Sequence, residues 1–326
     1  MNEKLLRQMR VEAEEIFRSS LEAADPYQAV KRFVHVEKDR LVVGMEGKHR
    51  VELDLTGYDR ILVVGGGKAT APMARAVEEV VGNRLDSGMI VVKYGFTEKL
   101  VLTQIVEAGH PLPDSNGVEG TRKILEFLQG AGEKDLIFSL MSGGGSALLT
   151  QPAGNITLSE KQEITRRLLA CGASIDEINA VRKHISLSKG GQMARAAFPA
   201  TIVNLMLSDV VGDKVEVIAS GPFTPDSSTF ETVWDVFRRY DLRDIPATIY
   251  GYLAAGAEGR IPETPKEGDA IFERVSNFVV GSNILALQAA AEKAQELGYE
   301  SLILSSMIEG ETREVARVHG AIAKEV

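Results

Sequence analysis

Cysteine is almost absent from this sequence. Cys171 is the only one in 326 residues. A single cysteine cannot close a disulfide within the chain, and it cannot build a cysteine cluster around a metal ion. A disulfide-stapled scaffold and a cysteine-based zinc site are therefore both excluded.

An excess of positive charge is also missing. The chain carries 37 Lys and Arg against 46 Asp and Glu, for a formal net charge of -9 and a pI of about 5.3. Nucleic-acid binding depends on Lys and Arg at phosphates, so this balance argues against a nucleic-acid partner. A small anionic substrate stays compatible with it, because a local basic pocket can lie in an acidic protein.

Long hydrophobic runs are lacking as well. No stretch approaches the roughly 18 apolar residues needed to span a bilayer. The first residues, "MNEKLLRQMRVEAEEIF", carry charges throughout and have no apolar core like that of a signal peptide. We therefore expect a soluble cytoplasmic protein without a membrane partner.

Apolar periodicity predicts an α/β fold. Residues 2–24 have helical spacing, and short β-rich runs at 33–55 predict an antiparallel meander. From residue 60, apolar runs alternate with helical segments, which is typical of a mostly parallel, doubly wound, Rossmann-like sheet between two helical layers. The length predicts two domains, or one domain with a large appendage. We expect a first domain at 1–254, a linker or excursion at 255–269, rich in Gly, Pro and charge, and the start of a second α/β domain at 270–326.

The first candidate site is "VVGGGKAT". Gly65, Gly66 and Gly67 end an apolar strand, and Lys68 follows just before a helix that carries Pro72 in its first turn. Helix N-termini favour anions. The sequence matches neither the Walker A motif nor GxGxxG. The alternative is a tight turn followed by a solvated lysine.

The second candidate is "SLMSGGGSALL". Ser142, Gly143, Gly144, Gly145 and Ser146 offer successive backbone N–H groups and two hydroxyls, a composition typical of a phosphate-binding concavity. The GxSxG nucleophile elbow is excluded, because Leu148 stands where its second glycine would be. The alternative is a glycine turn that permits close packing of strand and helix.

The third candidate is Asp209, which ends another apolar strand. A carboxylate beside a phosphate site is a plausible Mg²⁺ ligand, and a helix or turn cap is the alternative.

Two further segments carry polar residues that suit a binding site. In "SIDEINAVRKHIS", Ser174 and Glu177 form a capping box, and Asn179, Arg182, Lys183 and Ser186 share one face. That face binds carboxylate and phosphate, or it is simply solvated. In "AGHPLPDSNG", His110 follows a strand as a general base or a turn histidine, and Asp114 is predicted to cap the next helix.

Together these residues resemble the glycerate 2-kinases whose second domain is called MOFRL. The resemblance rests on "VVGGGKAT", "AGHPLPD", "SLMSGGGSALL", "GASIDEINAVRKHIS", "KGGQMA" and "LSDVVGDKVEVIASGPFTPDSST", in the family's order between residues 61 and 229. It implies transfer of phosphate from ATP to the 2-hydroxyl of D-glycerate with a divalent metal, Mg²⁺. Family members continue beyond the segment that ends here at Val326, so we expect the MOFRL portion to be absent from this chain.

The resemblance also implies roles for single residues. Lys68 would face the reacting phosphate, with Gly66 and Gly67 beside it. The loop Ser142 to Ser146 would hold ATP phosphates or glycerate. Asn179, Arg182 and Lys183 would line the cleft, with Arg182 on the carboxylate. Asp209 would lie near the metal, and Asp209 and His110 are alternative general bases.

Two other functions stay open. An NAD-dependent hydroxypyruvate reductase would explain the sheet and glycines, but GxGxxG with an acidic residue about 20 positions on is lacking. A non-catalytic protein that binds sugar acids or phosphate is the third interpretation. The expected partners are small molecules, glycerate and ATP, and a homodimer is left open.

Overall fold

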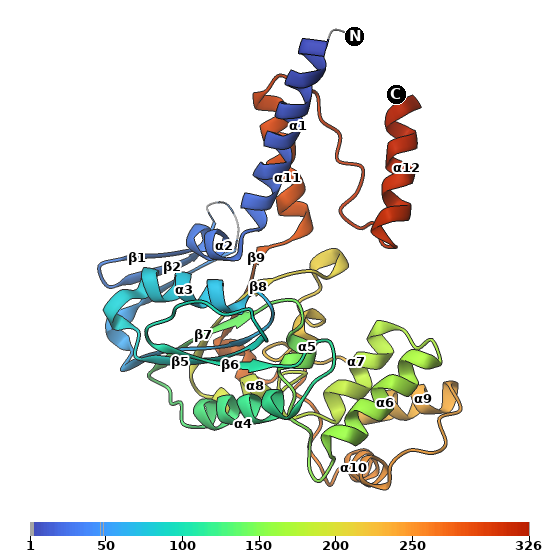
Figure 1. Cartoon of the computed structure of the whole chain (residues 1–326). Coiled ribbons are helices and arrows are strands. Elements are labelled where there is room, and N and C mark those ends of the chain that lie inside the picture. Colours follow the sequence, from blue (N-terminus) through green and yellow to red (C-terminus); the bar gives the residue numbers. More distant parts are fainter. Residues whose placement is uncertain (1–2, 46, 48, 326) are drawn as a thin grey trace.

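A six-stranded sheet forms the centre of the molecule (Figure 1). The computed structural model describes residues 3–45, 47 and 49–325. All strands of this sheet pair in parallel, in the order β6-β5-β4-β7-β8-β9. They are β4 (Arg60–Gly66), β5 (Ser87–Lys93), β6 (Thr103–Ala108), β7 (Asp135–Met141), β8 (Thr201–Leu207) and β9 (Val275–Gly281). The predicted mostly parallel α/β sheet is confirmed.

The central strands are apolar along their whole length because helices cover both faces of the sheet. Every residue of β7 is buried. In β4, Ile61 and Val63 join one core cluster, whereas Leu62 and Val64 join another. Successive side chains of a strand point to opposite faces, so each strand contributes to two hydrophobic cores.

Helices complete the three layers. Figure 1 shows α2 and α3 on one face of the sheet and α4 and α8 on the other. Met73 and Val77 of α3 pack in the first core, and Ile124 and Leu128 of α4 pack in the second. The bounds are α2 (Pro26–Phe33), α3 (Thr70–Val81), α4 (Ser115–Gln129) and α8 (Gln192–Ala197). The predicted doubly wound, three-layer arrangement is confirmed.

The meander predicted at 33–55 is present as a three-stranded antiparallel sheet. It consists of β1 (Val34–Glu37), β2 (Arg40–Gly44) and β3 (Arg50–Asp54). Leu41 and Val43 of β2 are buried and belong to the same core as α2 and α3. The meander therefore extends the first helical layer.

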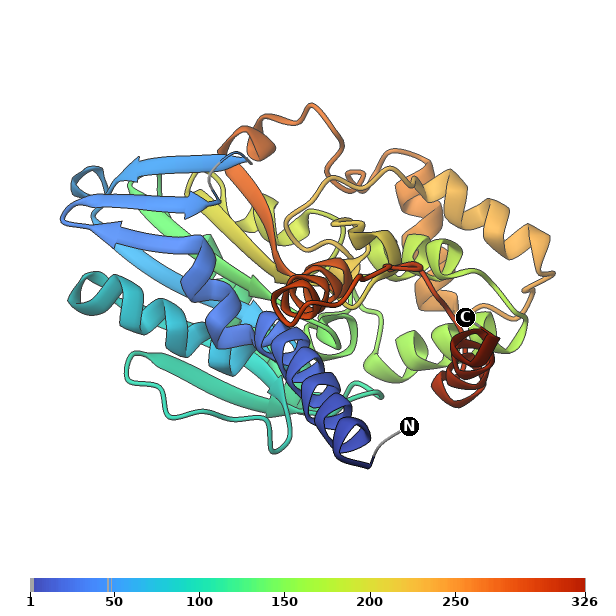
Figure 2. The same cartoon turned by 90° about the horizontal axis from the view of Figure 1, so that it is seen from above.

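A helical lobe lies beside the sheet, on the side away from the meander (Figure 2). Its core includes Ile164, Val181, Phe230 and Leu253. The helices of this region are α6 (Leu158–Ala170), α7 (Ile175–His184), α9 (Phe230–Arg239) and α10 (Ala247–Ala257), preceded by the short α5 (Gly145–Leu148). The prediction of one domain over 1–254 did not separate this third hydrophobic cluster.

The last part of the chain returns to the main sheet. Residues 258–269 contain no helix or strand, yet Thr264 is buried. β9 then pairs with β8, so the segment expected to start a second domain contributes a strand to the first sheet. The domain limits themselves stay predictions.

Three further helices lie beyond the sheet. The helix predicted at 2–24 is found as α1 (Glu3–Ala24), and it runs alongside α11 (Asn283–Glu296), whereas α12 (Thr312–Glu325) stands apart (Figure 1). The Ser19 hydroxyl donates to the Ala289 carbonyl across the α1–α11 pair at 3.3 Å. None of the described helices is both long and apolar enough to cross a bilayer.

Phe138 tests the importance of the central sheet for stability. Its ring lies in the middle of β7 and has no exposed surface. Replacement Phe138→Ala leaves a cavity under α3 and should lower the free energy of unfolding by about 3–5 kcal/mol. Urea denaturation measures this change. Leu169→Ala, at a side chain 61% exposed on α6, is the control and should change it by less than about 0.5 kcal/mol. Equal effects would contradict this core assignment.

Candidate active site

The candidate site lies at the point in the sheet where the order of the strands reverses. From β4 the chain proceeds through β5 to β6 on one side, and through β7, β8 and β9 on the other. The switch point therefore lies between the carboxyl ends of β4 and β7, where open α/β sheets bind ligands. Gly67 and Lys68 follow β4 at this point, and the loop from Ser142 follows β7.

Backbone hydrogen bonds join these two loops. The Lys68 amide donates to the Gly143 carbonyl at 2.9 Å, and the Ala69 amide donates to the Ser142 hydroxyl at 3.0 Å. A Cβ on Gly67 would lie 2.0 Å from the Ser142 hydroxyl oxygen. Only glycine allows this approach, so the first glycine cluster fixes the position of Lys68 against the second loop.

The glycine loop also contacts two predicted catalytic side chains. A Cβ on Gly143 would lie 2.1 Å from a carboxylate oxygen of Asp209, and one on Gly144 would lie 3.1 Å from Nε2 of His110. Gly144 has a φ of +89° and also faces the Lys68 side chain. The structure thus brings Lys68, His110 and Asp209 together around Gly143 and Gly144.

His110 is half-buried at this point and its charge state responds to its neighbours. Burial lowers the pKa of His110 below its ordinary value, and the positive charges of Lys68 and Lys93 lower it further, whereas Asp209 raises it. The imidazole is therefore favoured in its neutral form, which accepts a proton near neutral pH.

The serines of the loop bond to the protein itself. Ser142 is fully buried and accepts from the Ala69 amide. The Ser146 hydroxyl lies 2.8 Å from that of Ser220, and Ser220 donates to the Asn179 side-chain oxygen at 3.2 Å. This chain of contacts links the glycine loop to α7. Ser220 adopts a φ of +62°, a backbone conformation that a serine holds only under constraint from its surroundings.

The polar face of α7 is not a solvated face. The predicted capping box of Ser174 and Glu177 is present. Asn179 and Lys183 are both buried, and the Lys183 ammonium lies 3.1 Å from the Asp226 carboxylate. Arg182 makes no side-chain hydrogen bond or ion pair with the described residues, and burial lowers its pKa. Arg182 thus keeps its donors free, whereas Lys183 is already paired.

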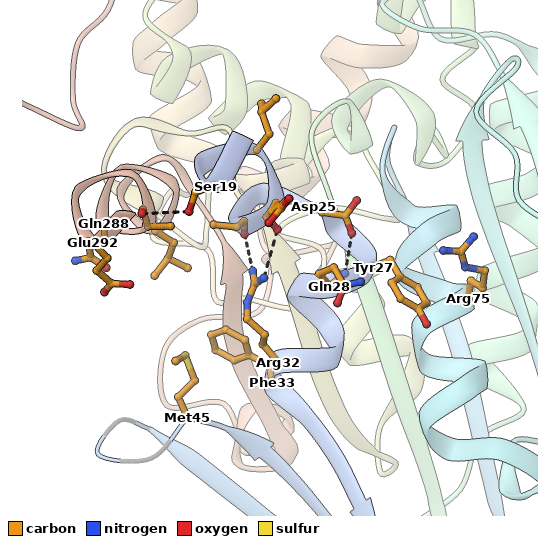
Figure 3. A pocket seen from close by; sticks show the side chains of 15 residues that line it. Ser19, Asp25, Tyr27, Gln28, Arg32, Phe33, Met45, Arg75, Gln288 and Glu292 are labelled. Atoms are coloured by element: carbon orange, nitrogen blue, oxygen red, sulfur yellow. Dashed lines mark hydrogen bonds between the residues drawn. The ribbon is translucent and has the colours of Figure 1, made fainter. Parts of the chain in front are cut away.

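Two cavities differ in their relation to these residues. One of about 420 Å³ has Asn179, Lys183 and Asp226 among its lining residues. Another, of about 1100 Å³, lies between α1, α2 and α11 (Figure 3). No predicted site residue lines this second cavity, and the Arg32 guanidinium at its edge donates to the Glu22 and Ala23 carbonyls. Of the two, only the first cavity is therefore lined by predicted site residues, and Lys68, His110 and Asp209 are not among its lining residues.

Metal-ligating groups are sparse in the part of the chain that the structure describes. No three His, Cys, Asp or Glu side chains gather there around one point. Asp209 is exposed, and its carboxylate makes no hydrogen bond or ion pair with the described residues. A cation at this place would have one protein carboxylate and would need its other ligands from a substrate.

Most of the predicted site residues lie close together at the carboxyl edge of the sheet. The switch point gathers Gly66, Gly67, Lys68, His110, Asp209 and the loop Ser142 to Ser146, and Asn179 reaches it through Ser220. Their catalytic and binding roles stay predictions. Asp114 caps α4 through the Gly117 amide, as predicted.

Sequence reasoning missed several polar residues. His184 contacts Glu263 at 2.7 Å, and the lysines Lys161 and Lys189 are buried. One feature of the sequence could have pointed to Lys189, because the glycine pair Gly190–Gly191 follows it directly. No feature of the sequence points to Lys161, since it looks like an ordinary lysine of an amphipathic helix.

Fold and site together define a doubly wound α/β protein in which two glycine loops and a lysine meet at the carboxyl edge of the sheet, an arrangement suited to phosphate groups. Residues 12–254 match the family described as a domain of unknown function, DUF4147. The chain is 39% identical over 308 residues to a glycerate 2-kinase of Pyrococcus horikoshii, covering 94% of this chain and 67% of that protein. This chain therefore belongs to the glycerate kinase family.

Two further comparisons bear on the function. The crystal structure of a glycerate kinase from Thermotoga maritima superposes with a TM-score of 0.82 at 36% identity, covering 98% of this chain and 70% of that one. A putative hydroxypyruvate reductase of Agrobacterium vitis is 42% identical over 264 residues, covering 81% of this chain and 58% of that protein. The chain thus spans about two thirds of the length of such relatives.

Titration of His110 tests the electrostatics of the cleft. Lys68→Met removes a positive charge that lowers the pKa of His110, so that pKa should rise. Asp209→Asn removes the carboxylate that raises it, so the pKa should fall. NMR titration of the imidazole C–H signals measures both shifts. Lys123→Met, at an exposed lysine of α4, is the control and should leave the titration unchanged. An unchanged His110 titration in both variants would show that the three side chains are not neighbours.

Proposed function

We propose that this chain is an ATP-dependent kinase that phosphorylates D-glycerate at its 2-hydroxyl to give 2-phosphoglycerate. The observation that carries the proposal is the convergence of Lys68, His110 and Asp209 on Gly143 and Gly144 at the switch point of the sheet. The relatives named as glycerate kinases support it, since they share this fold over most of the chain.

Backbone amides hold the phosphate groups in this proposal. Among the described residues, the amides of Gly143 and Gly144 donate to no backbone acceptor. They lie at the start of α5, where the absence of side chains lets phosphate oxygens approach the backbone. The serine hydroxyls, which bond to Ala69 and Ser220, hold the loop in shape.

Lys68 neutralises the phosphate that is transferred. Its side chain has no hydrogen-bond or ion-pair partner among the described residues, so its charge is available to a ligand. Phosphoryl transfer needs positioning and charge neutralisation more than covalent help from the protein. A compact ammonium at the mouth of the cleft supplies that neutralisation.

His110 takes the proton of the attacking hydroxyl. Its lowered pKa keeps the ring neutral at physiological pH, and its Nε2 edge faces the glycine loop. Asp209 is the alternative acceptor, because its carboxylate lies against Gly143 of the same loop.

Asp209 would hold Mg²⁺. A single carboxylate whose oxygens bond to no described residue fits a cation that takes its remaining ligands from phosphates and water. When bound, the cation would neutralise phosphate charge. Asp209 itself is positioned for this by the close contact with Gly143.

Arg182 and Asn179 would receive the hydroxy acid. The guanidinium of Arg182 has no side-chain partner among the described residues, and a planar fork binds a carboxylate through two parallel hydrogen bonds. Asn179 is tied to Ser220 and through it to the glycine loop, which sets the distance between carboxylate and phosphate.

The reductase named among the relatives suits this cleft less well. Dinucleotide-binding sheets place an acidic residue at the end of the second strand, where it bonds the ribose. Here β5, the neighbour of β4, ends in Lys93. A basic residue at that place favours a phosphate ligand over the ribose of NAD.

One pair of assays separates the proposed functions. The chain is incubated with D-glycerate, ATP and Mg²⁺, and in parallel with hydroxypyruvate and NADH. ADP formation supports the kinase, loss of NADH supports the reductase, and binding without turnover supports a non-catalytic protein. Enolase added without phosphoglycerate mutase should consume the product directly. A need for mutase would show that the 3-hydroxyl is phosphorylated instead.

Lys68→Ala tests the role of the ammonium. Removal of one preorganised donor typically lowers kcat by about 10²–10³ fold. We expect that loss while the melting temperature barely changes, because the Lys68 side chain bonds to no described residue. Lys68→Arg should restore only part of the rate, since a planar fork does not reproduce a point charge. Lys123→Ala, an exposed α4 lysine, is the control. Near-normal turnover of Lys68→Ala would show that Lys68 is only a solvated lysine after a tight turn.

A further inference from the structure

Three basic side chains from three separate elements lie near one another, and one of them contacts the segment after the glycine loop. Lys161 belongs to α6, Arg182 to α7, and Lys189 to the segment that leads into α8. They are close enough that the charge of Arg182 disfavours the charged form of both lysines. We call this set the buried cation cluster.

Two members of the cluster are removed from water almost completely. Lys161 is 5% exposed and Lys189 is 0% exposed. Lys161 donates to the Ile185 carbonyl at 3.3 Å, and Lys189 donates to the Leu149 carbonyl at 3.0 Å. An ammonium group has three N–H donors, and each of these lysines uses one of them in a hydrogen bond. Burial of a charged group with so few partners is unfavourable.

Two neighbouring side chains on the same helix have acidic partners. Lys183 lies 3.1 Å from Asp226, and His184 lies 2.7 Å from Glu263. By contrast, no member of the buried cation cluster has an ion pair with a described carboxylate. Lys183 and His184 thus each have an acidic partner, whereas Arg182 on the same helix has none among the described residues.

The cluster touches the backbone of the proposed phosphate site. Leu149 follows α5 directly, and its side chain packs against Gly66, where a Cβ would lie 2.4 Å from Leu149 Cγ. Its carbonyl accepts from the Ser188 hydroxyl at 2.9 Å as well as from Lys189. The cluster thus adjoins the cleft, and Arg182, its most accessible member, is only partly buried.

Burial and mutual repulsion act on the lysines in the same direction. Burial lowers the pKa of Lys161 to about 7, with a smaller contribution from Arg182. Burial also lowers the pKa of Lys189 well below its ordinary value, and Lys161 and Arg182 lower it further. Near pH 8 the Lys161 amine is therefore largely neutral while no anion is bound, and the charged form of Lys189 is disfavoured for the same reasons.

We propose that the buried cation cluster is an anion subsite in which Arg182 contacts the bound anion and Lys161 and Lys189 take up protons when that anion binds. The anion is one small acidic group, the carboxylate of the hydroxy acid or a phosphate of the nucleotide. This inference rests on the proposed function, because it adds a charge-compensating layer to the same cleft.

The direction of the proton movement follows from the charges. An anion at Arg182 favours the protonated form of a nearby amine, so it raises the pKa of Lys161 and Lys189. At a pH above the pKa of the free protein and below that of the complex, binding takes up protons. The affinity for the anion should therefore fall as the pH rises through that interval. Lys161, Arg182 and Lys189 are the charged groups that face one another there, from α6, α7 and the segment before α8.

Titration calorimetry of the full chain tests this coupling. D-glycerate, inorganic phosphate and ATP are titrated separately at pH 8 in two buffers with different ionisation enthalpies. The difference in heat gives the number of protons taken up, and we expect about one proton per anion. Uptake with glycerate alone assigns the subsite to the carboxylate, and uptake with phosphate and ATP alone assigns it to the phosphate.

Two variants test whether the lysines of the buried cation cluster take up the proton. Lys161→Met and Lys189→Met keep the length of the side chain without its charge, and a neutral, well-packed replacement of a buried charge is tolerated in many proteins. Each should reduce the proton uptake by half or more, and the double variant should abolish it. Lys123→Met is the matched control for an exposed lysine and should leave the uptake unchanged. If a variant fails to fold by its melting curve, the pH dependence of glycerate affinity in the unmodified chain decides instead.

Three results would overturn the inference: anion binding without proton uptake, uptake that persists in the double variant, or no binding of any of the three anions. Failure of the proposed function has a different signature. In that case phosphate or glycerate binds with proton uptake, but ATP and glycerate together give no ADP.

Discussion

The parallel pairing of β4 with β7 is the contact on which the site depends. It places two loops side by side at the switch point, and the bond from the Lys68 amide to the Gly143 carbonyl then fixes their distance. The pairing is stable because both strands are buried on both faces, beneath α3 and α4. The other residues of the site are brought to this junction by neighbouring elements. β6 delivers His110 to it, β8 delivers Asp209, and Ser220 ties α7 to it.

Charge is distributed very unevenly in this acidic protein. The chain as a whole carries -9, yet Lys68, at the switch point, and Arg182, on α7, have no side-chain hydrogen-bond or ion-pair partner among the described residues. Surface carboxylates meanwhile pair with arginines on the outer helices, as Glu119 does with Arg122. A cleft that keeps free cations inside an acidic surface attracts small anions without attracting nucleic acid. This contrast is the physical basis of the kinase proposal.

Some of this arrangement could be predicted from the sequence, because it depends on residues that are close together along the chain. Apolar runs that end in glycines predicted the strands β4 and β7 and the loops after them, because the carboxyl ends of parallel strands meet at one edge. The caps at Asp114 and Ser174 were equally local. Long-range relations were not predictable. Lys161 looks like a solvated lysine of α6, and only the packing of α7 against it makes it buried. Residues 255–269 look like a linker, yet Thr264 is buried beside Asp226.

The central claim is that Gly143 and Gly144 bind the phosphate groups that the kinase transfers. The most direct test is an NMR spectrum of the chain with isotope-labelled glycine, which reports on its 31 glycine amides. The spectrum is recorded with and without D-glycerate and a non-hydrolysable ATP analogue. The account predicts that the largest shifts belong to Gly143 and Gly144, assigned by substitution. Unchanged signals at both glycines, with ligand bound elsewhere in the protein, would contradict it.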